Sequence, residues 1–288
     1  MASLRAIKRR ITSVKNTRKI TRAMKMVAAA RLRRAQQRIS DLRPYAIKTS
    51  ELLSSVAART EGAGSHPLLA RRDEKKVLIV VLTSDRGLAG AFNASICKRA
   101  ASMWKAFEAQ GKEVTFAIVG RKGGDFFRRR DARIEKVFQG IFENLTSAKA
   151  GEVGRYIVDR YVAGELDAAY VVFNEFKSAI AQVVTSEQVL PIKLADLPVE
   201  GSSDYIYEPS KPALLDRLLP MYMEVVAFRA LLESVASEHG ARMTAMDNAT
   251  RNASEMIERL TLQYNRARQA SITKELMEII GGAEALKG

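Results

Sequence analysis

A long helical pattern that begins near Pro212 closes with the stretch YNRARQASITKELMEIIGGA, residues 264–283. Apolar residues recur along this pattern at steps of three and four, no proline follows Pro220, and Gly240 is the only glycine in it before Gly281. Gly281 and Gly282 predict the end of the helix, because glycine is common just past a helix C-terminus. A helix of about 70 residues is about 105 Å long, so it needs a long partner to pack against.

The partner that we expect is the other end of the chain, where residues 3–58 predict a second long helix. Its apolar stripe has a mean step of about 3.5 residues, which is the period of a coiled coil. We expect a kink at Pro44, or a short break before a second helical piece at 45–58. The stripe consists of Leu4, Ile7, Ile11, Val14, Thr21, Met24, Ala28, Leu32, Ala35, Ile39 and Leu42.

The last helix has its own stripe, again at steps of three and four: Val225, Phe228, Leu232, Val235, His239, Met243, Met246, Thr250, Ala253, Ile257, Leu260, Tyr264 and Ala267. Since the first helix leads into the middle of the chain and the last leads out of it, the two must lie antiparallel. From their lengths we expect the C-terminal end to extend about 20 Å beyond its partner.

The middle of the chain has a different pattern. Residues 59–75 are rich in turn formers and predict a linker, and residues 77–82 are a continuous apolar run typical of a strand buried on both faces. Further strands are expected at 114–119, 134–138, 168–174 and 179–190, with helices at 91–110, 121–130 and 147–163. This alternation predicts a small, mostly parallel α/β domain over 76–211, ending in a loop at 191–211.

The net charge of +15 is concentrated at the N-terminus, because residues 1–48 hold 15 lysines and arginines and one acidic residue, Asp41. Such a segment is typical of proteins that bind nucleic acid, an anionic membrane or an acidic protein partner. No aromatic residue precedes Tyr45 to stack on bases, and the charges surround the helix. Nucleic-acid binding remains an alternative function, and its candidate residues are Lys8, Arg9, Arg10, Lys15, Arg18, Lys19, Arg22 and Lys25.

Catalytic, metal and cofactor motifs are not found in the sequence. The single cysteine, Cys97, allows no intrachain disulfide and fits a reducing compartment, and no apolar run reaches the roughly 20 residues that span a bilayer. The turn at residues 84–90 joins a strand to a helix, but it lacks the Gly-Lys-Ser/Thr of a phosphate loop and has two glycines where the dinucleotide fingerprint has three. A nucleotide-dependent enzyme is therefore a third hypothesis, with Gly87 and Gly90 as its site.

Both ends of the chain resemble the gamma subunits of F-type ATP synthases. The resemblance lies in residues 11–28, ITSVKNTRKITRAMKMVA, and in Ile272, Thr273, Glu275, Glu278, Gly282 and Ala283. Two internal motifs agree with it, SDRGL at 84–88 and DYIYEP at 204–209. Ala89 and Ala91 replace residues that many members have as cysteine and glycine, and the cysteine-bearing insert of chloroplast members is missing. The resemblance covers essentially the whole chain.

The resemblance implies a long antiparallel coiled coil of the two end helices, 1–58 and 212–288, with a Rossmann-like α/β domain inserted between them. It implies a rotor shaft that couples rotation of the membrane c-ring to conformational cycling of the alpha and beta subunits. The gamma subunit itself would be non-catalytic and without cofactor or metal. Its partners would be the alpha, beta and epsilon subunits and the c-ring, with one copy in each complex. The expected location is the cytoplasmic side of the bacterial inner membrane, as a peripheral protein with no span of its own.

The resemblance also implies roles for individual residues. Arg268, Gln269 and Thr273 match the family's catch contacts with beta, and Met24 and Lys25 match the region near the beta lever. Tyr205, Tyr207 and Glu208 match the foot near the c-ring and epsilon. Packing in the helix pair is a second role for Met24 that is compatible with the first, and packing in the foot is an alternative role for the two tyrosines.

Overall fold

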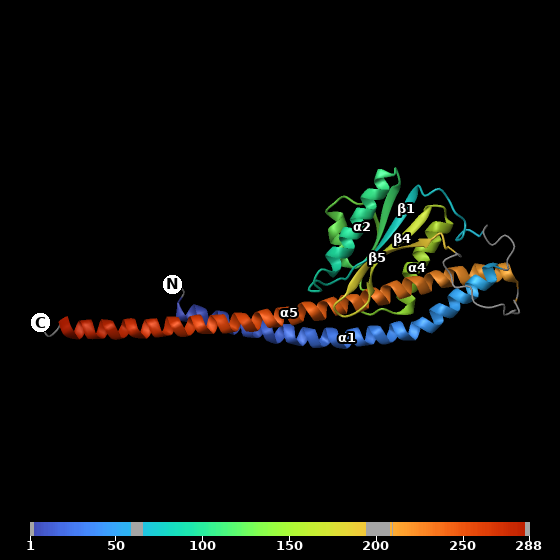
Figure 1. Ribbon diagram of the computed structural model, residues 1–288. Helices are drawn as coiled ribbons and strands as arrows, with labels where there is room; N and C mark the ends of the chain where they lie inside the picture. The colour runs from blue at the N-terminus through green and yellow to red at the C-terminus, as the bar shows by residue number, and fades with distance from the viewer. Residues whose placement is uncertain (1–2, 59–65, 194–207, 209, 286–288) are drawn as a thin grey trace. The chain divides into compact units, whose positions relative to one another are not determined.

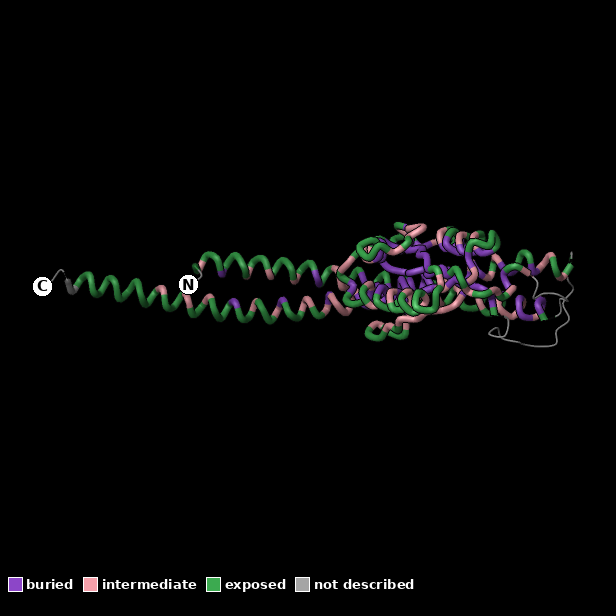
Figure 2. The backbone as a smooth tube through the Cα atoms, turned by 90° about the horizontal axis from the view of Figure 1, so that it is seen from above, coloured by how far each residue is buried: buried purple, intermediate pink, exposed green. Residues whose placement is uncertain are grey.

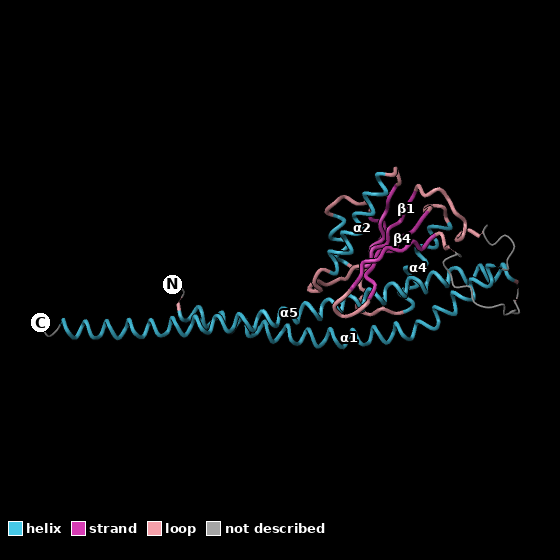
Figure 3. Tube along the Cα trace, viewed as in Figure 1, coloured by secondary structure: helices cyan, strands magenta, loops and turns pink. Residues whose placement is uncertain are grey.

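The computed structural model describes residues 3–58, 66–193, 208 and 210–285. The chain divides into two compact units, one formed by Met1–Val27 with Met243–Gly288 and the other by Ala28–Arg242. The second unit carries a five-stranded sheet with helices around it (Figures 1 and 3). The expected mixed α/β fold between an N-terminal and a C-terminal helix is confirmed.

The sheet has the strand order β3-β2-β1-β4-β5. Strands β1 to β4 are parallel to one another, and β5 pairs antiparallel with β4. Strand β1 lies at the centre, and all its residues after Lys76 are buried, as its continuous apolar run predicts. The strands span Lys76–Leu82 (β1), Glu113–Val119 (β2), Ile134–Phe138 (β3), Ala168–Phe176 (β4) and Gln182–Leu190 (β5).

Helices cover both faces of the sheet. Helix α2 (Phe92–Ala109) and helix α3 (Arg121–Arg128) contact each other and the strands on one face, while Figure 1 shows α4 (Ser147–Val162) on the other. Helix α4 begins at Thr146, whose hydroxyl accepts a hydrogen bond from the backbone N–H of Lys149. Apart from shifts of a few residues at the ends, the helices and strands of this domain lie where the sequence pattern predicts them.

Two glycines of α4 allow close contact with helix α5 (Lys211–Ala285). A Cβ atom added to Gly154 would lie 3.1 Å from the Cα atom of Glu224, and one added to Gly151 would lie 3.1 Å from the Glu224 carboxylate. Arg155 then forms an ion pair with Glu224 at 2.7 Å. Small residues on α4 thus bring the last helix close to this face of the domain.

Helix α5 also crosses the carboxyl ends of the central strands. The hydroxyl of Ser234 donates to the carbonyl oxygen of Leu82 at 3.4 Å, and that of Ser237 donates to the carbonyl oxygen of Asn174 at 3.0 Å. Both serines are fully buried. In open α/β sheets a ligand commonly binds at this edge. Here a segment of the same chain occupies it.

Thr83 organises the junction where β1 and β2 end. Its buried hydroxyl donates to the carbonyl oxygen of Val119 at 2.8 Å and accepts from the backbone N–H of Gly123 at 2.9 Å. Gly120 lies between them with a φ of 89°. A side chain at Gly120 would collide with the backbone carbonyl group of Thr83, so glycine is required there.

The first and last helices are more continuous than expected. Helix α1 spans Leu4–Ala58 with Pro44 inside it, so the alternative of a break at Pro44 is wrong, and Figure 1 shows the later part of α1 curving instead. Leu53 and Val56, both fully buried, hold the turns that follow the proline in place. Helix α5 passes through Gly281 and Gly282 to Ala285, so the predicted end at these glycines is also wrong. Neither glycine has a positive φ, and glycine permits helical as well as left-handed backbone.

Candidate functional site

Within the unit formed by Met1–Val27 and Met243–Gly288, α1 and α5 run in opposite directions. The hydroxyls of Thr21 and Thr250 lie 2.8 Å apart, and Lys25 Nζ lies 2.6 Å from Asp247 Oδ1. Buried residues recur every seven positions on α5, at Met246, Ala253 and Leu260. Most other residues of this unit are exposed, as Figure 2 shows. A narrow seam of small and medium side chains therefore joins the two helices.

Met24 and Lys25 lie beside this seam and are half-buried. The hydrogen bond from Lys25 lowers the pKa of Asp247. Because Lys25 is already paired with a carboxylate of its own chain, its charge is partly neutralised. An acidic partner that approached Lys25 would therefore encounter an ion pair that has already formed, whereas Arg22, three residues earlier, is exposed.

The pairing register places Arg268, Gln269 and Thr273 beyond the end of α1. Since Thr21 lies opposite Thr250, Leu4 lies opposite a residue near position 267. From there α5 continues alone to Ala285, a length of about 27 Å at 1.5 Å per residue. All three predicted contact residues are exposed on this single helix.

The unaccompanied end of α5 has a large apolar surface. Ile272, Leu276, Met277, Ile279 and Ile280 are all at least half exposed. Five such residues within nine positions are more than the scattered apolar residues of an ordinary surface, and such a cluster usually marks a contact with another molecule.

The residues predicted for the foot are only partly described. Glu208 is exposed, while Tyr205 and Tyr207 lie outside the described residues. The predicted roles of all three stay predictions.

The basic residues of α1 that could contact nucleic acid are mostly exposed. Six of the eight candidate nucleic-acid contacts are exposed, and Arg18 and Lys25 are half-buried beside the seam. Four of the exposed bases, Lys8, Lys15, Lys19 and Arg22, recur at steps of three, four and seven and so share one face of the helix, whereas Arg9 and Arg10 lie off that face.

The turn at residues 84–90 is held by hydrogen bonds within the chain. Asn93 Oδ1 accepts from the backbone N–H of Ser84 at 2.9 Å, and the carboxylate of Asp85 accepts from the backbone N–H groups of Arg121 and Gly140. Arg242 of α5 donates to the carbonyl oxygen of Gly87 at 3.2 Å. These contacts fix the turn from three sides, which favours a structural role for it over the nucleotide site of the third hypothesis.

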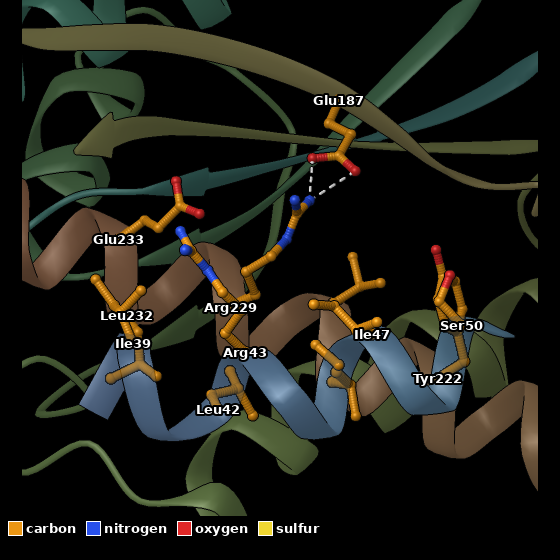
Figure 4. Close-up of a pocket in the computed structure, with 13 residues that line it drawn as sticks. Ile39, Leu42, Arg43, Ile47, Ser50, Glu187, Tyr222, Arg229, Leu232 and Glu233 are labelled. Atoms are coloured by element: carbon orange, nitrogen blue, oxygen red, sulfur yellow. Dashed lines mark hydrogen bonds and ion pairs between the residues drawn. The ribbon is translucent and has the colours of Figure 1, made fainter. Parts of the chain in front are cut away.

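A cavity of about 480 Å³ lies between α1, α5 and β5 (Figure 4). Its walls are mostly apolar and include Ile39, Ile47 and Leu232. Nη2 of Arg229 donates to both carboxylate oxygens of Glu187, at 2.8 and 2.6 Å. Glu233 lies beside this pair, and burial raises the pKa of its carboxyl group.

A second cavity, of about 450 Å³, has a different character. Arg31, Arg34 and Arg38 of α1 line it together with the loop at 142–145 and His239 of α5. Burial, followed by the charges of Arg242 and Arg31, lowers the pKa of His239 to about 4. The imidazole is therefore neutral at pH 7, inside a cavity whose charges are mainly positive.

Among the described residues no group of three or more His, Cys, Asp or Glu side chains is placed to hold a metal ion. Over the same part of the chain, no helix combines the length and the hydropathy that crossing a bilayer requires.

Comparison with known proteins identifies the family. A family model described as ATP synthase matches residues 3–286, and the ATP synthase gamma chain of Geobacter metallireducens is 54% identical, with all of both chains covered. The chain belongs to the ATP synthase gamma-chain family. The gamma chain of Sorangium cellulosum is 51% identical, again over all of both chains. A chain in the structure of the Tetrahymena thermophila mitochondrial ATP synthase central stalk and c-ring is 25% identical, with a TM-score of 0.63, and covers 80% of this chain and 99% of that chain.

The gamma-chain resemblance seen in the sequence is thus confirmed, but sequence reasoning missed the charged network around His239. Glu238 is almost fully buried and Arg242 is mostly buried, and the two side chains lie 2.7 Å apart. Their spacing of four residues on a helix with glutamate first was a usable signal, because such pairs face each other. The contact between Arg229 and Glu187 joins segments far apart in the sequence and left no such signal.

His239 gives this gamma-chain family member a predicted pH dependence. The folded-state pKa is about 4, whereas an unfolded histidine titrates near 6.5. Between these values the unfolded chain binds the extra proton, so the free energy of unfolding should fall as pH drops from 6.5 towards 4, by about 2–3 kcal/mol. Urea unfolding at pH 7 and pH 4.5 measures this loss. The His239→Gln variant should lose less than the wild type over that interval, and an equal loss in both would contradict the prediction.

Proposed function

We propose that the chain is the central rotor shaft of a proton-translocating F-type ATP synthase. In this role it couples rotation of the c-ring to conformational cycling of the catalytic subunits, and so to ATP synthesis or hydrolysis. The observation that carries the proposal is the match to gamma chains over the full length of the molecule. The solved relative in a central stalk and c-ring supports it.

The helix pair suits a shaft. We propose that α1 and α5 form an antiparallel coiled coil, because the buried residues of α5 recur at seven-residue spacing, and because the Thr21–Thr250 and Lys25–Asp247 contacts together fix opposite directions. Two helices joined along a seam resist twisting more than one helix does. The proposed functional parts are the helical segments 1–58 and 212–288, the linker 59–75 and the α/β foot 76–211.

The C-terminal end of α5 is suited to rotate inside a ring of other subunits. Its exposed apolar residues, Ile272, Leu276, Met277, Ile279 and Ile280, make a surface that can turn against an apolar sleeve, since dispersion contacts have little directional preference. Just below it we propose that Arg268, Gln269 and Thr273 contact beta, and that Met24 and Lys25 lie near the beta lever. Exposed ion pairs are each worth about 0–1 kcal/mol, which suits a contact that must be made and broken on every turn.

The remaining assignments follow from the same role. We propose that the chain contributes no catalytic group, and that the chemistry belongs to alpha and beta. The foot, with Tyr205, Tyr207 and Glu208, would contact the c-ring and epsilon. One copy would serve each complex, as a peripheral protein on the cytoplasmic side of the bacterial inner membrane.

The Arg268→Ala variant tests the proposed catch. Reconstituted in vesicles with its complex, it should lower proton-driven ATP synthesis by up to about fivefold, which corresponds to about 1 kcal/mol of lost contact energy. Arg259→Ala is the matched control, because Arg259 is exposed on the same helix and pairs with Glu255 of its own chain at 3.4 Å. Synthesis unchanged by Arg268→Ala, or lowered equally by both variants, would remove the assignment of Arg268.

A further inference from the structure

The cavity lined by Arg31, Arg34 and Arg38, here named the arginine cavity, has more positive charge than its surroundings neutralise. The three arginines recur at steps of three and four on α1, so they share one face of the helix. Glu143 is the one carboxylate among the lining residues, and it forms an ion pair with Arg86 at 3.5 Å. The lining therefore carries a net positive charge.

The three arginines differ in their partners. Arg38 donates to the carbonyl oxygen of Leu145 at 2.8 Å, which fixes its guanidinium against the loop. For Arg31 and Arg34, no carboxylate of the described residues lies within ion-pair distance. The guanidinium groups of Arg31 and Arg34 therefore border the cavity, and each has a planar array of N–H donors. Neither has a carboxylate counter-ion among the described residues.

The interior of the arginine cavity has a buried polar group. His239 is 5% exposed, and its ring borders the cavity beside the apolar side chains of Leu232 and Val235. The ring lies 3.5 Å from Arg242, a distance at the outer limit for a hydrogen bond. A neutral imidazole has one N–H that it can donate to an acceptor. The cavity therefore has two charged donors at its rim, Arg31 and Arg34, and one neutral donor in its interior, His239.

We propose that the arginine cavity binds a small oxyanion of the phosphate class, such as pyrophosphate or the polyphosphate of a nucleotide. Its volume of about 450 Å³ falls in the range of small-molecule sites. Guanidinium forks match phosphate oxygens in geometry and form the stronger, charge-assisted hydrogen bonds. The proposal goes beyond the rotor role and does not depend on it.

His239 provides a spectroscopic signal for occupancy. The chain has two histidines, His66 and His239, so a chain labelled with ¹³C-histidine gives two imidazole signals. A bound anion offsets the nearby positive charges and should therefore raise the pKa of His239, while His66 near Asp216 serves as an internal reference. The charged groups that face His239 are Arg31, Arg34 and Arg38 of α1, Asp85 and Arg86 of the turn after β1, Glu143, and Glu238 and Arg242 of α5.

The test is a titration of the full chain with potassium pyrophosphate, with potassium chloride keeping the ionic strength constant. The expected result is a saturable shift of the His239 signal without a shift of His66. Arg34→Gln should weaken binding by about tenfold or more, since it removes a charge-assisted contact. Arg33→Gln, which makes the same charge change at an exposed neighbour outside the lining, should weaken it less than about twofold.

Three outcomes would overturn the proposal. The first is a His239 signal that does not move or does not saturate, as expected if an acidic side chain of a partner protein is the true occupant. The second is an equal loss in Arg33→Gln and Arg34→Gln, which would mean non-specific attraction to a basic helix. The third is an equal shift of both histidines. Far-ultraviolet circular dichroism of each variant verifies its helix content before titration.

Discussion

Replacing Gly120 with alanine should destabilise the α/β unit by more than about 3 kcal/mol. The backbone at Gly120 has a φ of 89°, which an L-residue adopts only with strain. A new Cβ atom would also collide with the carbonyl oxygen of Thr83 and lie 2.8 Å from the carbonyl carbon of Ser84. These atoms belong to the backbone at the end of β1, so neither can move without disturbing the sheet.

Comparing Gly120→Ala with Gly140→Ala separates the two causes of the loss of stability, which are backbone strain and the steric collision of the new Cβ atom. Gly140 has a similar φ of 70°, but no atom lies within 4 Å of its would-be Cβ. Gly140→Ala should therefore cost about 1–2 kcal/mol, the strain alone. Urea unfolding followed by circular dichroism gives both values. Equal losses in the two variants would show that the backbone of Thr83 gives way, contrary to the packing described above.

Removing the charge of Arg242 should cost about 3–5 kcal/mol of unfolding free energy. Its guanidinium lies 2.7 Å from the carboxylate of Glu238, whose side chain is 5% exposed. In Arg242→Met the glutamate would stay buried without its counter-ion, and the hydrogen bond to the carbonyl oxygen of Gly87 would be lost as well. A buried charge without a partner is one of the few changes that destabilise a protein this strongly.

Two further variants distinguish this mechanism from a loss of packing. Adding Glu238→Gln to Arg242→Met removes the isolated charge and should recover part of the stability, because the remaining amide is neutral. Arg259→Met breaks a pair of the same spacing on the exposed part of α5 and should cost less than about 0.5 kcal/mol. If the double variant were no more stable than Arg242→Met, the loss would lie in packing and not in charge.

The sequence pattern predicts the elements of this chain well where a buried face dictates the spacing. After their first residues, Lys76 and Glu113, strands β1 and β2 are mainly apolar and rich in β-branched residues, and their neighbours follow the alternation expected of a parallel sheet. The wrong predictions concern proline and glycine. Both residues have local preferences, but a helix continues through Pro44 and Gly281 because the residues on either side favour it more strongly than one residue opposes it.

The candidate sites also differ in how far the sequence predicts them. The exposure of Arg268, Gln269 and Thr273 was foreseeable from the lengths of the two helices, because the longer helix must extend past the shorter. The arginine cavity was not, since Arg31 and His239 meet only after the chain has folded. A spacing of three and four on α1 shows that its arginines share a face, but not which loop they face.

The buried thiol of Cys97 has a consequence for fluorescent labelling. Burial raises the pKa of Cys97 to about 12, with Arg130 opposing the shift, so the thiolate that reacts with maleimides is almost absent at neutral pH. The chain has no other cysteine. A cysteine introduced at an exposed position, such as that of Glu165, would therefore take up a dye selectively. Cys97 therefore does not have to be removed before the protein is labelled for single-molecule measurements of its rotation.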